Sequence, residues 1–148
     1  IHIINKWEIP HNLIEIEFTE TAYTDKEDKL RKTLDLLKKD DISSSIDDFG
    51  SGYSSLSLLQ NLDFDIIKLD KSLIDTLISK EKSMKVVRNI VRMAKDLNMS
   101  VLAEGVESKN EYDILSDLDC DMIQGYLFDK PLSKQEFEKR LVKKEYSF

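Results

Sequence analysis

The sequence predicts an α/β fold in which strands and helices alternate around one parallel sheet. Five short apolar runs are each followed by a segment with helical periodicity, and no Pro/Gly-rich linker interrupts them. The 148 residues, 41% hydrophobic and 34% charged, are typical of about one globular domain. Strands that alternate with helices in this way form βα units and a parallel sheet.

Each predicted strand is a short run rich in isoleucine, valine or leucine. Residues 14–18 alternate apolar with acidic side chains, which is the period of a strand that has one polar face. Residues 66–70 and 100–103 are more continuously apolar, as in parallel strands that are covered on both faces. In chain order, the predicted strands are residues 14–18, 42–48, 66–70, 100–103 and 122–128.

The intervening segments carry apolar residues at helical spacing. Leu30, Leu34 and Leu37 fall on one helical face, and Ser133 with Glu136 forms a capping box at the start of the last helix. Residues 1–7 resemble the tail of a preceding helix. The predicted helices are residues 25–38, 54–60, a helix from 72, 82–97, 110–118 and a helix from 133.

Polar residues cluster where each predicted strand runs out: Glu17, Asp47 with Asp48, Lys68, Glu104 and Gln124. Both a (β/α) barrel and an open doubly wound sheet bind ligands beyond the carboxyl ends of their strands. The barrel is favoured, because all the strands contribute a polar end and not only two neighbours. Five βα units are too few to close an eight-stranded barrel, so we expect an incomplete TIM-like barrel.

The adjacent pair Asp47-Asp48 ends the second strand and precedes a glycine-rich turn. Side chains alternate along a strand, but at its end Asp48 need not follow that alternation. Both carboxylates could then reach one divalent cation or two neighbouring ones, since Mg²⁺ prefers oxygen ligands. The alternative is an Asx-type turn that only caps the strand.

Composition excludes several classes of function. A net charge of −7 argues against a binder of nucleic-acid polymers. Cys120 is the single cysteine, which predicts a buried inert thiol and a reducing, cytoplasmic compartment. His2 and His11 are isolated, so a zinc site is not expected.

Five motifs occur in order along most of the chain. They are Glu17-Phe18-Thr19-Glu20, Asp47-Asp48-Phe49-Gly50-Ser51-Gly52-Tyr53-Ser54-Ser55, Lys68-Leu69-Asp70, Ala103-Glu104-Gly105-Val106-Glu107 and Gln124-Gly125-Tyr126-Leu127-Phe128. Each motif alone is weak evidence, but together they resemble the C-terminal portion of an EAL domain, the cyclic-di-GMP-specific phosphodiesterase family. Residues 1–148 are therefore expected to be a partial EAL-type domain.

This resemblance implies a TIM-like barrel that hydrolyses cyclic-di-GMP to linear pGpG in bacterial second-messenger signalling. Two Mg²⁺ or Mn²⁺ ions would activate the water and neutralise the transition state. By similarity, Glu17, Asp47 and Asp48 would be metal ligands. Lys68 would contact the attacking water or a phosphate oxygen, and Glu104 would ligate metal through water or help to deprotonate the nucleophile.

The remaining motif residues are implied to bind substrate or to control a loop. Gln124 would hold a metal-bound water or the substrate, and Asp70 would orient Lys68 or support the ligands from behind. The mobile loop would comprise Phe49, Gly50, Ser51, Gly52 and Tyr53, anchored by Glu107. Glu15 shares the strand face of Glu17, but the motif register favours Glu17 as the ligand.

The family's Glu-Ala-Leu motif and an upstream asparagine ligand have no counterpart in the sequence. The fragment alone is therefore expected to be inactive, whereas its parent would be a cyclic-di-GMP hydrolase. The parent could carry a GGDEF or sensory domain or a membrane anchor, and it could form a homodimer. The main alternative is a catalytically inactive EAL-like receptor for cyclic-di-GMP. A third possibility is a half-barrel that pairs with another copy, because five strands leave two open sheet edges.

Overall fold

The computed structural model describes residues 1–19, 27–50 and 55–143, and within them one parallel sheet runs through the molecule. The spatial order of its strands is the order of the chain, so every strand pairs with its successor. The strands are β1 (Glu15–Thr19), β2 (Ser43–Phe49), β3 (Ile66–Leu69), β4 (Ser100–Ala103) and β5 (Met122–Ile123). All their carboxyl ends therefore point to one edge of the sheet.

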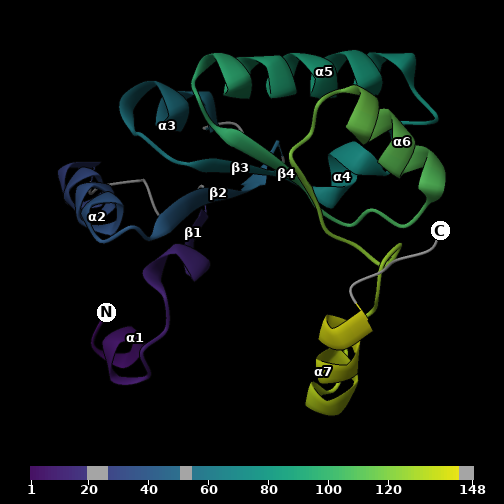
Figure 1. Ribbon diagram of the computed structural model, residues 1–148. Helices are drawn as coiled ribbons and strands as arrows, with labels where there is room; N and C mark the ends of the chain where they lie inside the picture. Colours follow the sequence, from purple (N-terminus) through teal and green to yellow (C-terminus); the bar gives the residue numbers. More distant parts are fainter. Residues whose placement is uncertain (20–26, 51–54, 144–148) are drawn as a thin grey trace.

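Helices connect the strands, and most of them cover one face of the sheet. They are α1 (His2–Lys6), the 3₁₀ helix η1 (His11–Leu13), α2 (Glu27–Lys39), α3 (Ser55–Asn61), α4 (Lys71–Ile74), α5 (Glu81–Asp96), α6 (Lys109–Asp117) and α7 (Lys134–Lys143). Figure 1 shows α3 and α5 on one side of the strands and α1 and α7 on the other. No helix in the described ranges is both long and apolar enough to span a bilayer.

The hydrophobic core lies between the sheet and helices α2 to α6. On β3 and β4, Ile67, Leu69, Val101 and Ala103 alternate toward this core and are fully buried. From the helices, the core receives Leu30, Leu34, Leu58, Leu59, Ile74, Val87, Val91, Ala94 and Leu115. Sequential strands with their connecting helices on one face are the arrangement of a barrel wall, since a doubly wound sheet is covered on both faces.

The predicted elements are confirmed in type and order, with one marked difference in length. The fifth strand was expected over residues 122–128, but β5 ends at Ile123. Beyond it the chain turns over Val106, whose N–H donates to Gln124 O and whose carbonyl accepts the N–H of Leu127. These bonds are to a loop residue and not to β4, which itself ends at Ala103. In the described structure, Gln124 is therefore the last residue after β5 that bonds to β4, through its N–H to Ala103 O.

Gly125 is required at this turn because it touches the backbone of Val106. A Cβ built on Gly125 would lie 2.0 Å from Val106 O and 2.4 Å from Val106 N. Neither backbone atom can rotate away as a side chain would. The glycine of the Gln-Gly-Tyr motif is thus explained by the close approach of two loops.

Two aspartates fasten the amino ends of the strands in the same way. Asp65, just before β3, accepts the N–H of Ser44 at 2.8 Å, and Asp121, just before β5, accepts the N–H of Val101 at 2.7 Å. Ser44 and Val101 are each the second residue of the preceding strand. Asp121 also pairs with Lys95 of α5. Burial would raise the pKa of Asp121, but the bonds from Lys95 and Val101 outweigh it and lower this pKa below 3.8.

We expect Asp121→Asn to destabilise the fold at neutral pH by about 1–2 kcal/mol, because it weakens charged hydrogen bonds that are partly screened by solvent. A carboxyl with a lowered pKa stabilises the folded state above its ordinary pKa, and this contribution is lost as pH falls through the folded value. The difference in unfolding free energy between the two proteins should therefore shrink below about pH 4. Urea denaturation across a pH series measures it.

Asp119→Asn is the matched control, since Asp119 is exposed, lies 3.7 Å from the same lysine and adopts a positive φ that asparagine tolerates. It should change stability by less than about 0.5 kcal/mol. Equal destabilisation by both substitutions, or a deficit for Asp121→Asn that does not shrink as the pH is lowered below about 4, would contradict this assignment.

We expect Gly125→Ala to destabilise the fold by about 3 kcal/mol or more, because the added methyl group overlaps backbone atoms that cannot move independently. Thermal and urea denaturation measure this loss. Ser116→Thr adds one methyl group at an exposed helical position and should cost only a few tenths of a kcal/mol, roughly the difference in helix propensity. Near-wild-type stability of Gly125→Ala would show that the two loops do not pack as described.

Candidate functional site

Lys68 lies at the centre of the carboxyl edge of the sheet, on the face opposite the helices. Its side chain is 5% exposed, and its Nζ is 2.6 Å from Glu17 Oε1, 3.0 Å from Asp47 Oδ1 and 2.9 Å from Glu104 Oε1. Glu17 comes from β1, Asp47 from β2, and Glu104 directly follows β4. One ammonium group therefore joins the ends of four strands.

The charge of Lys68 is stabilised despite its burial. Desolvation alone would lower the pKa of this lysine, but hydrogen bonds to Glu17, Glu104 and Asp47 raise it well above its ordinary value. Lys68 is therefore a permanent cation at physiological pH. It can neutralise an anion or orient a polar ligand, but it is not suited to act as a general base.

A bulge in β2 brings the adjacent aspartates to the same place. Ile46 pairs with Ile67 and Phe49 with Leu69, so β2 uses one residue more than β3 over this stretch. Within this bulge, Asp48 adopts φ 57°, a conformation that aspartate tolerates better than most residues. The regular alternation is broken there, and neighbouring side chains need not point to opposite faces.

Asp47, Asp48 and Glu104 converge as a result. Each offers one carboxylate oxygen, and these oxygens lie within 4.8 Å of one another. A cluster of three carboxylates is a donor set that suits hard divalent cations such as Mg²⁺ and Mn²⁺. The structure thus brings together three of the predicted ligand or catalytic residues, and the plain Asx-turn alternative does not account for Glu104.

Glu17 is joined to this cluster through Lys68. Its side chain is 52% exposed, and its carboxylate accepts a short hydrogen bond from the ammonium group. Among the described residues, the group of carboxylates close enough to share a cation does not include Glu17. Of the two glutamates on this face of β1, Glu17 and not Glu15 is the one that contacts Lys68.

Asp70 and Gln124 lie beside the site without joining the cluster. Asp70 is the N-cap of α4, where its carboxylate accepts the N–H of Ser72 at 3.0 Å and the hydroxyl of the same residue. Gln124 follows β5, held by its N–H to Ala103 O at 2.9 Å. A direct role for either residue toward metal or substrate stays a prediction.

Glu107 contacts a lysine that the sequence analysis did not single out. Lys71 Nζ is 2.9 Å from both Glu107 Oε1 and Asp75 Oδ1, and these two partners raise the pKa of Lys71. The stem of Lys71 packs on Gly105, where φ is 70° and an added Cβ would lie 2.6 Å from Lys71 Cγ. Lys71 therefore clamps α4 to the loop that carries Glu104. The i,i+4 spacing signals the pairing of Lys71 with Asp75, but no spacing in the sequence signals its contact with Glu107.

The predicted mobile loop starts later than expected. Phe49 is the last residue of β2 and is buried in the core, so it is not a loop residue. Gly50 follows with φ 100°. Ser51, Gly52 and Tyr53 lie outside the described residues, so the anchoring of this loop by Glu107 stays a prediction.

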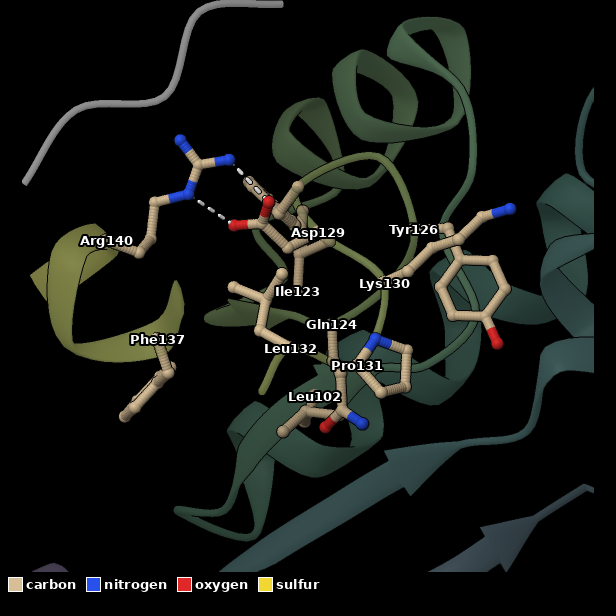
Figure 2. Close-up of a pocket in the computed structure, with 12 residues that line it drawn as sticks. Leu102, Ile123, Gln124, Tyr126, Asp129, Lys130, Pro131, Leu132, Phe137 and Arg140 are labelled. Atoms are coloured by element: carbon tan, nitrogen blue, oxygen red, sulfur yellow. Dashed lines mark hydrogen bonds and ion pairs between the residues drawn. The ribbon is translucent and has the colours of Figure 1, made fainter. Parts of the chain in front are cut away.

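A separate apolar pocket of about 680 Å³ lies between the sheet and α7. Figure 2 shows Phe137 and Arg140 of α7 on one side of it, with Leu102, Gln124 and Leu132 among the residues from the sheet and the segment after β5. An ion pair between Arg140 and Asp129 fastens α7 beside it. Among the residues that the structure describes, Gln124 is the only predicted site residue in the lining, so the pocket is distinct from the carboxylate cluster.

Ser45 lies two positions before Asp47 on the same face of β2, fully buried, and its Oγ has no hydrogen-bond partner within the described ranges. Such an atom suits an ordered water. Burial raises the pKa of the Cys120 thiol to about 11, which disfavours the reactive thiolate.

Comparison with known proteins identifies the family. The model of the EAL domain family matches residues 1–131. Cyclic di-GMP phosphodiesterase NbdA of Pseudomonas aeruginosa is 38% identical over 86% of the chain. The chain spans 16% of the length of NbdA and 17% of three other curated relatives.

Solved structures give the same answer for the fold. The EAL domain of Mycobacterium smegmatis DcpA superposes with a TM-score of 0.93 at 32% identity, covering 99% of this chain and 66% of that one. A manganese and cyclic-di-GMP complex of Klebsiella pneumoniae BlrP1 superposes with a TM-score of 0.79 at 35% identity, covering 86% and 33%. The five strands are thus part of a TIM-like (β/α) barrel, and the chain belongs to the EAL domain family.

Proposed function

We propose that this chain is the C-terminal part of a metal-dependent phosphodiesterase that hydrolyses cyclic-di-GMP to linear pGpG. The convergence of Asp47, Asp48 and Glu104 beside the Lys68 ammonium is the observation that carries the proposal. Support comes from NbdA, which is named a cyclic di-GMP phosphodiesterase, and from the BlrP1 complex with cyclic-di-GMP.

The residue types match the needs of phosphodiester hydrolysis. The substrate is anionic and gains negative charge in the transition state, so fixed positive charge at the reacting phosphate lowers the barrier. Lys68 supplies one such charge and keeps it at physiological pH. We assign Lys68 to a phosphate oxygen or the attacking water, and Glu104 to the proton of that water, which a carboxylate within hydrogen-bond reach can accept.

The carboxylate cluster would hold divalent metal. Asp47 and Asp48 are the ligands whose placement the β2 bulge explains, and Glu17 would join them from β1. When bound, Mg²⁺ or Mn²⁺ would lower the pKa of a water and neutralise phosphate charge. Asp70 and Gln124 would support this centre from the ends of β3 and β5, while Gly50 to Tyr53, with Glu107, would form the loop over it.

Full activity is assigned to a protein that also contains the remaining barrel strands. This chain covers 66% of the DcpA EAL domain, and its own residues provide one part of the proposed metal site. For the parent, we propose a GGDEF or sensory domain in the same polypeptide. We also propose that its catalytic domain is cytoplasmic and that it forms a homodimer. The chain alone should turn over cyclic-di-GMP slowly or not at all.

We expect Asp48→Asn in the parent to reduce hydrolysis of cyclic-di-GMP by on the order of 100-fold or more, since loss of a ligand costs at least as much as loss of a ligand's support. Asparagine tolerates the positive φ of Asp48, so the fold should persist. Chromatographic separation of pGpG from cyclic-di-GMP, with Mg²⁺ or Mn²⁺ present, measures the rate.

Asp113→Asn is the control, because it removes the same charge from an exposed residue of α6. Turnover of this variant should match that of the wild type. No turnover by the wild-type parent, with cyclic-di-GMP still bound, would establish the receptor alternative instead. Unchanged turnover in Asp48→Asn would remove Asp48 from the site.

A further inference from the structure

Lys68 and the candidate metal site use the same side chains. Asp47 and Glu104 are two of the three carboxylates that converge within 4.8 Å, and they are also two of the three partners of Lys68. The third partner, Glu17, holds the ammonium at 2.6 Å from the side of β1. A cation at this cluster would therefore lie close to a lysine that already neutralises part of the cluster.

The burial of Lys68 makes this competition strong. Repulsion between two cations is stronger at short distance and at a low local dielectric constant. It is therefore stronger for partly buried groups a few ångströms apart than for exposed groups at the same distance. Contacts of 2.6–3.0 Å with Glu17, Asp47 and Glu104 hold the ammonium beside the cluster. It must shift away from Asp47 and Glu104 or accept a nearby divalent charge.

We propose that Lys68 is the internal counter-cation of the carboxylate cluster, which keeps Glu17, Asp47 and Glu104 together without metal and weakens the binding of a divalent cation. Three carboxylates so close together would repel one another, and the lysine removes that repulsion. Cation occupancy of the site then depends on the free cation concentration. This inference rests on the metal site of the proposed function and adds that its affinity is limited from within.

Lys68 also has an effect that favours cation binding, and the test shows which of the two effects is larger. By ordering Asp47 and Glu104, Lys68 reduces the entropy that a cation must remove from these side chains on binding. Both carboxylates are mostly buried, with side chains about one fifth exposed, so little of that entropy remains to be saved. Charge repulsion is therefore expected to outweigh ordering.

The test compares the binding of Mn²⁺ alone to the wild-type chain, Lys68→Met and Lys95→Met by calorimetry and electron paramagnetic resonance. Lys68→Met should bind Mn²⁺ about tenfold tighter or more, as expected on removing a unit charge beside a partly buried cation. Lys95→Met is the matched control, since Lys95 also pairs with two carboxylates but lies at the opposite end of the strands. It should leave the affinity within about twofold of wild type, because distant charges are screened.

The possible results separate the counter-cation role of Lys68 from the existence of the metal site. Equal or weaker binding by Lys68→Met overturns the counter-cation role while the metal site stands, and equal tightening by both variants reduces the effect to net charge. Binding by neither wild type nor Lys68→Met overturns this inference, because these residues then hold no cation whose affinity Lys68 could limit. The metal site of the complete barrel is tested separately by Asp48→Asn in the parent.

A second measurement uses the unaltered chain, in case Lys68→Met does not fold. The ammonium signal of Lys68 in a nitrogen–proton NMR spectrum should shift or broaden as Mg²⁺ is added, with the same concentration dependence as Mg²⁺ binding. Lys68→Arg, which keeps the charge, assigns the signal by its loss. A Lys68 signal that stays unchanged while Mg²⁺ saturates the site would contradict the proposal.

Discussion

A buried ammonium group dictates the arrangement of the carboxyl edge of the sheet. An unpaired charge at the position of Lys68 would cost several kcal/mol in lost hydration, so it persists only with close partners of opposite charge. The chain supplies three, from β1, β2 and the end of β4, at 2.6–3.0 Å. Because Lys68 itself lies on β3, this single requirement fixes four strand ends relative to one another and places their acidic side chains around one point.

The bulge in β2 follows from the same requirement. A regular strand would direct Asp47 and Asp48 to opposite faces, and only one of them could face Lys68 and Glu104. The extra residue and the positive φ of Asp48 resolve this conflict at a local backbone cost that aspartate bears more easily than most residues. Strain of this kind at a strand end is typical of binding and catalytic sites. The proposed metal site and the proposed counter-cation are thus two aspects of one charge arrangement.

The order of the strands and the cluster of charged residues at their carboxyl ends were predictable from the sequence. Parallel strands end at a common edge, so acidic and basic residues after successive strands had to lie near Glu104 and Lys68. The short β5 was not predictable, because it depends on contact between Gly125 and Val106, which are distant in sequence. Nor was the pairing of Lys71 with Glu107, since it depends on how α4 meets the loop after β4. The cap that Asp70 forms with Ser72 is local, but the motif comparison had assigned Asp70 to the site instead. Motif spacing locates strand ends, whereas side-chain partners depend on the packing of loops.

The most direct test of this account is a crystal structure of the chain with Mn²⁺, in which anomalous scattering locates the ion. We expect an anomalous peak coordinated by Asp47 and Asp48 and close to Glu104, with Lys68 Nζ displaced from at least one of its carboxylate partners relative to the metal-free crystal. An anomalous map without a peak at these carboxylates, while all three Lys68 contacts persist, would contradict it.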